Sequence, residues 1–360
     1  MTDFRFELLG QNGSLRRGRY HTPHGSFETP CFAPVGTYAT LKGLTPEQVR
    51  TTGSELILAN SYHLHVRPGA ERIERLGGLH RFMGWDGPIL TDSGGYQVFS
   101  LGGKVKIDDQ GVTFQSVIDG STHRCTPESV LTFQQKLGPD IAMVLDHCPA
   151  GDADRDTQRA AHLRTLSWAR QARDLHEAWG GSTRGQAVFG ICQGGVDLEL
   201  RAESAVAMAA MDFDGYAIGG LSVGETKQQM AVALDACVDQ LPINRIRYMM
   251  GVGMPDDLLV ATARGVDLFD CVVPTRHGRN HTAFGSGGVS MKLRNAQYAD
   301  DPAPLVEGCE CYTCRKFCRA YLRHLAVADE MLAGILLSLH NIHYLQDLMR
   351  GIRAKAEGSA

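Results

Sequence analysis

The sequence predicts an α/β fold, a (β/α)8 barrel of the TIM type, from three observations. Short apolar runs recur along the chain, each ends in a polar or glycine-rich turn, and a helical stretch follows. Runs that are apolar throughout are typical of parallel strands buried on both faces. Eight strand–helix units are the number that closes such a barrel. The predicted strands cover residues 31–35, 56–60, 88–92, 141–146, 187–193, 215–219, 245–251 and 268–272.

Helix signals lie between these strands. Thr45-Pro46 and Thr126-Pro127 each place a capping hydroxyl before a proline at the first helical position. Residues 157–179 and 198–211 form longer amphipathic patterns. A doubly wound sheet is the alternative architecture, but the chain does not open with the glycine fingerprint of a dinucleotide-binding fold. The barrel is therefore favoured.

Three segments depart from the alternation of strands and helices. An Asn12-Gly13 turn predicts an N-terminal hairpin at 3–20. Residues 103–124 alternate hydrophobic and polar side chains, which predicts an antiparallel insertion. The tail carries a cysteine cluster and then a helical region. We therefore expect a barrel catalytic domain at 1–300 with both insertions, and a zinc-binding subdomain at 301–353 whose C-terminal helix packs on the barrel.

Composition and charge limit the classes of function. Of the 360 residues, 43% are hydrophobic and 21% charged, as in globular proteins. No apolar run reaches the ~20 residues of a membrane helix, and the polar N-terminus is unlike a secretory signal. We therefore expect a cytoplasmic protein without a membrane partner. The net charge of −4 means that a nucleic acid must bind through local basic patches, such as those at 276–281 and 315–324.

Four of the ten cysteines are clustered near the C-terminus. The first three lie within six residues and the fourth follows four residues later: Cys309, Cys311, Cys314 and Cys318. Three close thiolates and one distant histidine match the ligand set of a structural zinc site. The candidate histidines, on or near a helix expected at 332–348, are His340 and His343, with His324 further off. Free thiols or a disulfide are the alternative.

Aspartates stand at the ends of three predicted strands, where barrel enzymes gather their chemistry. They are Asp92, Asp146 and Asp270. A single such residue is often a helix cap or a turn former, but three beside glycine-rich turns favour a catalytic site. Two carboxylates around an anomeric carbon can break a glycosidic bond, one as nucleophile and the other as acid–base. A third can bind a nucleobase.

Four blocks of sequence resemble the tRNA-guanine transglycosylase, or queuine tRNA-ribosyltransferase, family. They are TDSGGYQVFS at 91–100, GICQGG at 190–195, GGLSVGE at 219–225 and PTRHGRN at 274–280. The resemblance extends from the first hairpin to the final helix. It implies a pentosyltransferase that exchanges guanine at the anticodon wobble position of tRNA for another base.

The resemblance also implies a role for each matching residue. Asp270 is the expected nucleophile, which holds the tRNA ribose covalently, and Asp92 is the expected general acid–base. The implied base contacts are Ser93, Tyr96, Asp146, Cys148, Gln193, Gly219, Gly220, Leu221, Val223 and Met250. The implied tRNA contacts, in a basic loop after the nucleophile's strand, are Arg276, His277, Gly278 and Arg279. The implied zinc ligands are Cys309, Cys311, Cys314 and His340, which leaves Cys318 and His343 without a role.

The incoming base and the assembly follow from the same resemblance. Val223 matches the bacterial branch, and its bulk favours 7-aminomethyl-7-deazaguanine over the larger queuine. The chain also ends soon after the zinc region, without the RNA-binding extension of archaeal relatives, so the bacterial reaction is expected. Phe317, Tyr321 and His324 match the region of the family's homodimer contact. We therefore expect a homodimer with one structural Zn²⁺ per subunit.

Three other functions fit parts of the pattern. A noncatalytic RNA-binding partner of the same fold would not need both Asp92 and Asp270. A retaining glycoside or nucleoside hydrolase would use a similar carboxylate pair, with water as the acceptor. A zinc hydrolase would need an open coordination position, which four protein ligands do not leave.

Overall fold

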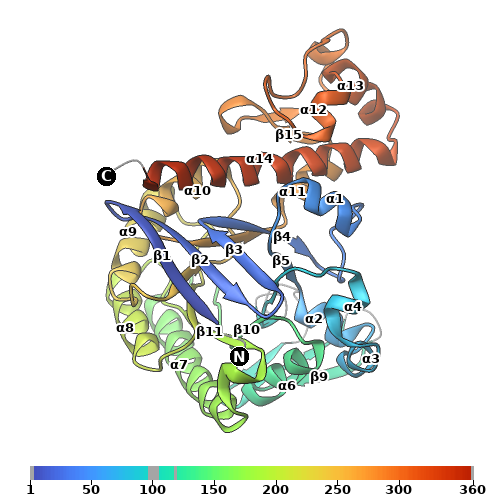
Figure 1. Cartoon of the computed structure of the whole chain (residues 1–360). Coiled ribbons are helices and arrows are strands. Elements are labelled where there is room, and N and C mark those ends of the chain that lie inside the picture. Colours follow the sequence, from blue (N-terminus) through green and yellow to red (C-terminus); the bar gives the residue numbers. More distant parts are fainter. Residues whose placement is uncertain (1–3, 96–104, 117–119, 358–360) are drawn as a thin grey trace.

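Eight parallel strands form a closed barrel in the computed structural model, which describes residues 4–95, 105–116 and 120–357 (Figure 1). The strands follow one another around the barrel in chain order, and the last pairs with the first. Each coincides with one of the predicted runs, so the fold class is confirmed. The strands are β4 (Cys31–Gly36), β5 (Ile57–Ala59), β6 (Ile89–Thr91), β10 (Ile141–Met143), β11 (Ala187–Cys192), β12 (Gly215–Ile218), β13 (Ile246–Met249) and β14 (Leu268–Cys271).

Helices surround the barrel. α1 and α6 begin at the predicted caps, because Thr45 Oγ1 accepts from the Gln48 N–H at 3.3 Å and Thr126 Oγ1 accepts from the Ser129 N–H at 3.1 Å. Within the described ranges, no helix combines the length and the apolar character needed to cross a membrane. Between β4 and β14, the α-helices of the described residues are α1 (Pro46–Thr51), α2 (Ser61–Val66), α3 (Ala70–Arg75), α4 (Gly78–Met83), α6 (Pro127–Leu137), α7 (Arg155–Ala178), α8 (Leu198–Ala209), α9 (Lys227–Val238) and α10 (Pro255–Thr262).

The N-terminal segment is larger than the predicted hairpin at 3–20, because a third antiparallel strand extends it. From this sheet, Arg16 donates to the carbonyl of Arg245 at 3.0 Å and forms an ion pair with Asp267 at 3.2 Å. Both partners lie just before barrel strands begin, so the sheet covers the N-terminal ends of the strands. The C-terminal ends stay open. The strands of the sheet are β1 (Arg5–Asn12), β2 (Leu15–Thr22) and β3 (Gly25–Thr29).

The insertion after β6 is antiparallel, as predicted for 103–124. Its strands β7 (Lys106–Asp108), β8 (Gly111–Gln115) and β9 (Thr122–Cys125) form one sheet, although part of the predicted range lies outside the described residues. Trp168 of α7 donates its indole N–H to the carbonyl of Asp109 at 2.8 Å, so the insertion is anchored to the barrel's outer layer.

The C-terminal part contains one correction. The basic segment 276–279, expected to be a loop, belongs to the helix α11 (Val273–Arg279). Proline near its first turn favours this helix, and Gly278 packs so closely on Ser338 that a Cβ would lie 2.4 Å from its Oγ. The final helix is also longer than 332–348, and it extends from the zinc subdomain across the barrel (Figure 1). The remaining elements are β15 (Thr282–Phe284), β16 (Ser290–Lys292), α12 (Tyr312–Lys316), α13 (Arg319–Val327) and α14 (Met331–Glu357).

Candidate active site and metal centre

A cavity of about 410 Å³ lies at the open end of the barrel. The three predicted aspartates line it together, although they come from strands far apart in the sequence. Tyr96 lies outside the described residues. The predicted site residues that line the cavity are Asp92, Ser93, Asp146, Cys148, Gly219, Gly220, Leu221, Val223, Met250, Asp270 and Arg276.

Asp92 follows β6 and is buried, with 7% of its surface exposed. The Ser61 N–H donates to its Oδ1 at 2.9 Å, and the side-chain amide of Asn60 donates to its Oδ2. Burial raises the pKa of Asp92 to about 7, the negative charge of Asp270 adds to this effect, and the hydrogen bonds from Ser61 oppose it. Asp92 is therefore suited to exchange a proton near neutral pH.

Asp270 lies in β14, and one of its oxygens is held by two donors. The Tyr248 hydroxyl donates to Oδ1 at 2.6 Å and the Gly251 N–H donates to the same atom at 2.8 Å. Burial raises the pKa of Asp270, whereas these two hydrogen bonds lower it. No hydrogen bond to Oδ2 is found in the described part of the chain. The two donors therefore hold the carboxyl group by one oxygen and leave the other without a hydrogen bond from the described residues.

Asp146 is joined to an amide and a hydroxyl. Ser93 Oγ donates to its Oδ1 at 3.0 Å, and Gln193 Nε2 donates to its Oδ2 at 2.7 Å. Burial raises the pKa of this carboxyl group, and the two hydrogen bonds lower it. Gln193 is only 1% exposed, and its Oε1 has no hydrogen-bond partner among the described residues. An unpaired buried acceptor is costly. Gln193 does not itself line the cavity, and its amide is joined to the site through Asp146.

The segment after β12 forms another wall of the cavity. Gly220 has a φ of +66°, and a Cβ there would lie 2.4 Å from Gln193 Oε1, so only glycine fits. Further along, Glu225 accepts hydrogen bonds from the backbone N–H groups of Ser222 and Val223, the second at 3.0 Å. Val223 also lines a neighbouring cavity of about 640 Å³, and therefore stands between two spaces.

The four residues of the basic helix differ in their surroundings. Arg276 lines the cavity and is exposed, as is Arg279. The ring of His277 lies beside Phe284, with 5.7 Å between centroids. Gly278 is buried against α14. The two arginines are thus the exposed cations of this helix, while close packing against α14 explains the glycine at 278.

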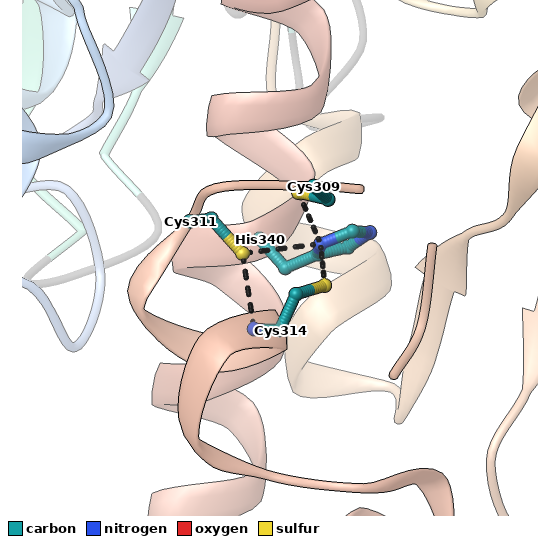
Figure 2. A group of neighbouring side chains, drawn as sticks. All are labelled: Cys309, Cys311, Cys314 and His340. Atoms are coloured by element: carbon teal, nitrogen blue, oxygen red, sulfur yellow. Dashed lines mark hydrogen bonds between the residues drawn. The ribbon is translucent and has the colours of Figure 1, made fainter. Parts of the chain in front are cut away.

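A second cluster lies in the C-terminal subdomain, where three cysteine sulfurs surround one histidine nitrogen (Figure 2). His340 Nδ1 is 3.9 Å from Cys309 Sγ, 3.5 Å from Cys311 Sγ and 3.3 Å from Cys314 Sγ. The cysteines come from the loop and first turn at α12, whereas the histidine comes from α14. These are the four predicted ligands. Cys318 and His343 are not part of this group.

Comparison with known proteins decides the family. A family model described as queuine tRNA-ribosyltransferase matches residues 12–358. The chain belongs to the queuine tRNA-ribosyltransferase family. Curated proteins of that name are similar over almost their whole length. One from a Ruegeria species is 50% identical over 97% of this chain and 92% of its own. One from Novosphingobium aromaticivorans is 51% identical over 99% and 96%, and one from Pelotomaculum thermopropionicum 52% identical over 98% and 93%.

The cysteine–histidine cluster of this queuine tRNA-ribosyltransferase family member fits a zinc ion. Tetrahedral ligands at zinc bond lengths place sulfur and nitrogen about 3.6 Å apart, close to the distances here. His340 Nε2 lies 2.7 Å from the carbonyl oxygen of Phe284, so the proton resides on Nε2 and the lone pair of Nδ1 faces the sulfurs. Four protein ligands would leave a zinc ion here no open coordination position, as in structural zinc sites.

Removing one of these four residues should prevent metal binding without disturbing the cavity at the open end of the barrel. In Cys311→Ala we expect loss of zinc binding and a fall in melting temperature on the order of 5 °C or more, because a zinc ion at this cluster would link α12 to α14. Elemental analysis and thermal unfolding measure both effects. Cys318→Ala is the matched control and should keep its zinc. A Cys311→Ala protein with a full complement of zinc would contradict the ligand set.

Several residues of the site had no signal strong enough to find them in the sequence. Asn60 ends a predicted strand, as the aspartates do, but an amide at that place is ordinary. Tyr248 lies inside a buried strand and looks like core. Glu225 lies in a loop, where charged side chains are usual. Their partners became visible only when the fold brought separate strands together.

Proposed function

We propose that the protein is a bacterial-type tRNA-guanine transglycosylase. It would exchange guanine at the wobble position of tRNA for 7-aminomethyl-7-deazaguanine through a covalent ribosyl-enzyme at Asp270. The observation that carries the proposal is one cavity with two carboxylates in different environments, Asp92 with a pKa near neutrality and Asp270 held by two donors. Family membership supports the same substrate class.

In the first step, Asp270 Oδ2 attacks C1′ of the ribose as the C1′–N9 bond breaks. The bonding electrons leave with guanine, and Asp92 supplies the proton that neutralises them. In the second step, Asp92 takes the N9 proton of the incoming base, whose nitrogen attacks C1′ and frees the Asp270 carboxylate. Throughout, Asp146 and Gln193 bind the base edge, while Tyr248 and Gly251 hold Asp270 in place.

The tRNA and the assembly complete the proposal. Arg276 and Arg279 would bind phosphates beside the exchanged nucleotide. Arg319 and Arg323 of the second basic cluster instead bond within the subdomain, Arg319 to Asp301 at 2.9 Å and Arg323 to the Asn295 carbonyl at 3.0 Å. The zinc would hold this subdomain together. Phe317 stacks on the partly exposed Tyr321, with centroids 5.2 Å apart, and we place the homodimer contact there.

The decisive experiment is incorporation of labelled guanine into tRNA that contains guanine at the wobble position. Label in the RNA, together with an adduct that survives denaturation, supports the exchange reaction. An abasic RNA product without label would support the hydrolase alternative. If neither product forms, the noncatalytic RNA-binding alternative is supported.

Val223 is expected to limit the size of the incoming base. Val223→Gly removes the wall shared by the base cavity and its neighbour, so 7-deazaguanines with bulky 7-substituents should become substrates. Exchange of guanine itself should change by less than about threefold, because guanine has no substituent there. Competition between guanine and a 7-deazaguanine with a bulky 7-substituent, in the wild type and in the variant, measures the effect. Unchanged rejection of the bulky base would remove Val223 from this role.

A further inference from the structure

Arg201 is a buried arginine with no role in the steps above. It lies in α8, its exposed fraction is 0%, and its guanidinium points at three backbone carbonyls. Nε donates to Gly195 O at 2.7 Å, Nη1 to Cys192 O at 3.2 Å and Nη2 to Gly220 O at 3.2 Å. One side chain therefore links the end of β11 and its loop to the segment after β12.

The environment of this guanidinium is unusual for a buried charge. No carboxylate forms an ion pair with it in the described part of the chain, and Glu225 acts on it only through longer-range charge. Burial lowers the pKa of Arg201, which is the sign of a desolvation cost. A charge that is buried without a counter-ion must be compensated by other hydrogen bonds. Here all three of the hydrogen bonds go to backbone carbonyl oxygens, and one of these, that of Gly220, belongs to a residue that lines the base cavity.

These carbonyls belong to the two segments that present hydrogen-bonding groups to a base. Cys192 directly precedes Gln193, and Gly195 follows it two residues later. Two bonds from one planar guanidinium on either side of Gln193 fix the backbone from which its amide projects. The amide in turn holds Asp146 at 2.7 Å, so the position of Arg201 affects both base-binding side chains.

The third bond sets the direction of a peptide group. Because the peptide is planar and trans, a Gly220 carbonyl aimed at Arg201 turns the Leu221 N–H to the opposite side. The Gly220 N–H faces the thiol of Cys148, which lines the base cavity. The positive φ of Gly220 makes this peptide easy to reorient in the absence of a tether. Arg201 supplies that tether.

We propose that Arg201 is a positioning residue for base recognition, which keeps Gln193 and the Gly220 peptide oriented so that the cavity offers hydrogen-bond donors and acceptors in the pattern of a guanine edge. This inference rests on the proposed function. It assigns Arg201 an effect on the affinity for the free base, whereas contacts to the rest of the tRNA are left unchanged. Replacing a residue needed only for folding would not weaken binding of the free base while leaving binding of the tRNA unchanged.

The test compares Arg201→Met and Arg201→Lys with Arg16→Met, which removes another buried arginine at the opposite end of the barrel. In guanine exchange, Arg201→Met should raise KM for guanine about tenfold or more and leave KM for tRNA within about twofold. Arg201→Lys keeps the charge but loses the planar fork, and should give a smaller increase. Arg16→Met should lower the melting temperature with KM for guanine unchanged.

The outcomes separate this inference from the proposed function. If the wild-type protein exchanges guanine but both Arg201 variants keep its KM for guanine, Arg201 has no positioning role. If Arg201→Met fails to fold, Arg201→Lys decides alone, with an unchanged KM again overturning the inference. Absence of exchange by the wild-type protein would instead refute the proposed function, and direct calorimetric titration with guanine would still measure the effect of Arg201 on the base.

Discussion

Asp270→Ala should abolish the covalent tRNA adduct and reduce base exchange by about 10⁴-fold or more, the scale seen when a nucleophile is removed. Without the carboxylate, no atom of the enzyme can hold the ribose while the bases exchange. The adduct is measured by denaturing gel electrophoresis after incubation with tRNA, and exchange by incorporation of labelled guanine. A denaturant-stable adduct in the alanine variant would assign the nucleophile to another residue.

Tyr248→Phe is the matched control for this variant. It keeps the Asp270 carboxylate and removes one of its two donors, so the adduct should still form, at a rate reduced by roughly tenfold.

Asp270→Ala should also keep the fold, because Asp270 is only partly buried and its carboxyl group makes two hydrogen bonds. The cost is an unpaired Tyr248 hydroxyl, about 1–3 kcal/mol, which leaves most of the stability of such a domain. Circular dichroism and thermal unfolding check this point.

The barrel was predictable because its strands are buried on both sides. In β11, all residues from Ala187 to Cys192 are buried, and the sequence is accordingly apolar throughout. β3 gave no comparable signal, because only two of its five residues are buried and the remainder is small or polar. The helix α11 was also missed. Its basic residues suggest a solvated loop, and the contact that makes it a helix is with α14, sixty residues away in the chain.

The candidate site was predictable to a different extent. Asp92, Asp146 and Asp270 were found because a carboxylate after an apolar run is conspicuous, and because barrel strands share one catalytic end. Their individual roles came from the resemblance, and they stay predictions. What the sequence did not contain is the set of donors that distinguishes them. Asn60 follows β5 and Tyr248 lies in β13, and which carboxylate each reaches depends on the register of the closed barrel.

Asp92 should impose opposite pH dependences on the two halves of the reaction. Its pKa is about 7, so the carboxyl group is protonated below this pH and ionised above it. Adduct formation needs the acid and should slow as the pH rises above about 7. Transfer to the incoming base needs the conjugate base and should slow as the pH falls below it. Single-turnover measurements of each half reaction against pH separate the two limbs of the pH–rate profile, the decline above about pH 7 and the decline below it.

Asp92→Asn should remove both limbs and slow each half reaction by about 10²–10⁴-fold, the usual contribution of a positioned acid–base group. The asparagine keeps a similar shape but cannot transfer a proton. If both limbs persist in the variant with unchanged inflections, the titrating group lies elsewhere, in the tRNA base or in another side chain. Loss of rate without loss of the limbs would have the same meaning.

Protein stability gives an independent measure of the same pKa. A carboxyl group whose pKa is raised by folding binds its proton more tightly in the native state, so its ionisation favours unfolding. The stabilisation that protonated Asp92 contributes to the folded state is therefore fully present below the pKa of the unfolded state, near 4. It is lost as the pH rises towards about 7, and amounts to on the order of 4 kcal/mol.

Asp92→Asn lacks this pH-dependent contribution. The difference in unfolding free energy between variant and wild type should thus shift in favour of the variant from pH 4 to 7 and then stay constant, whatever constant cost the amide adds through its contact with Asn60. A difference that does not depend on pH would show that Asp92 is ionised throughout this range, and a general acid at this position would then be ruled out.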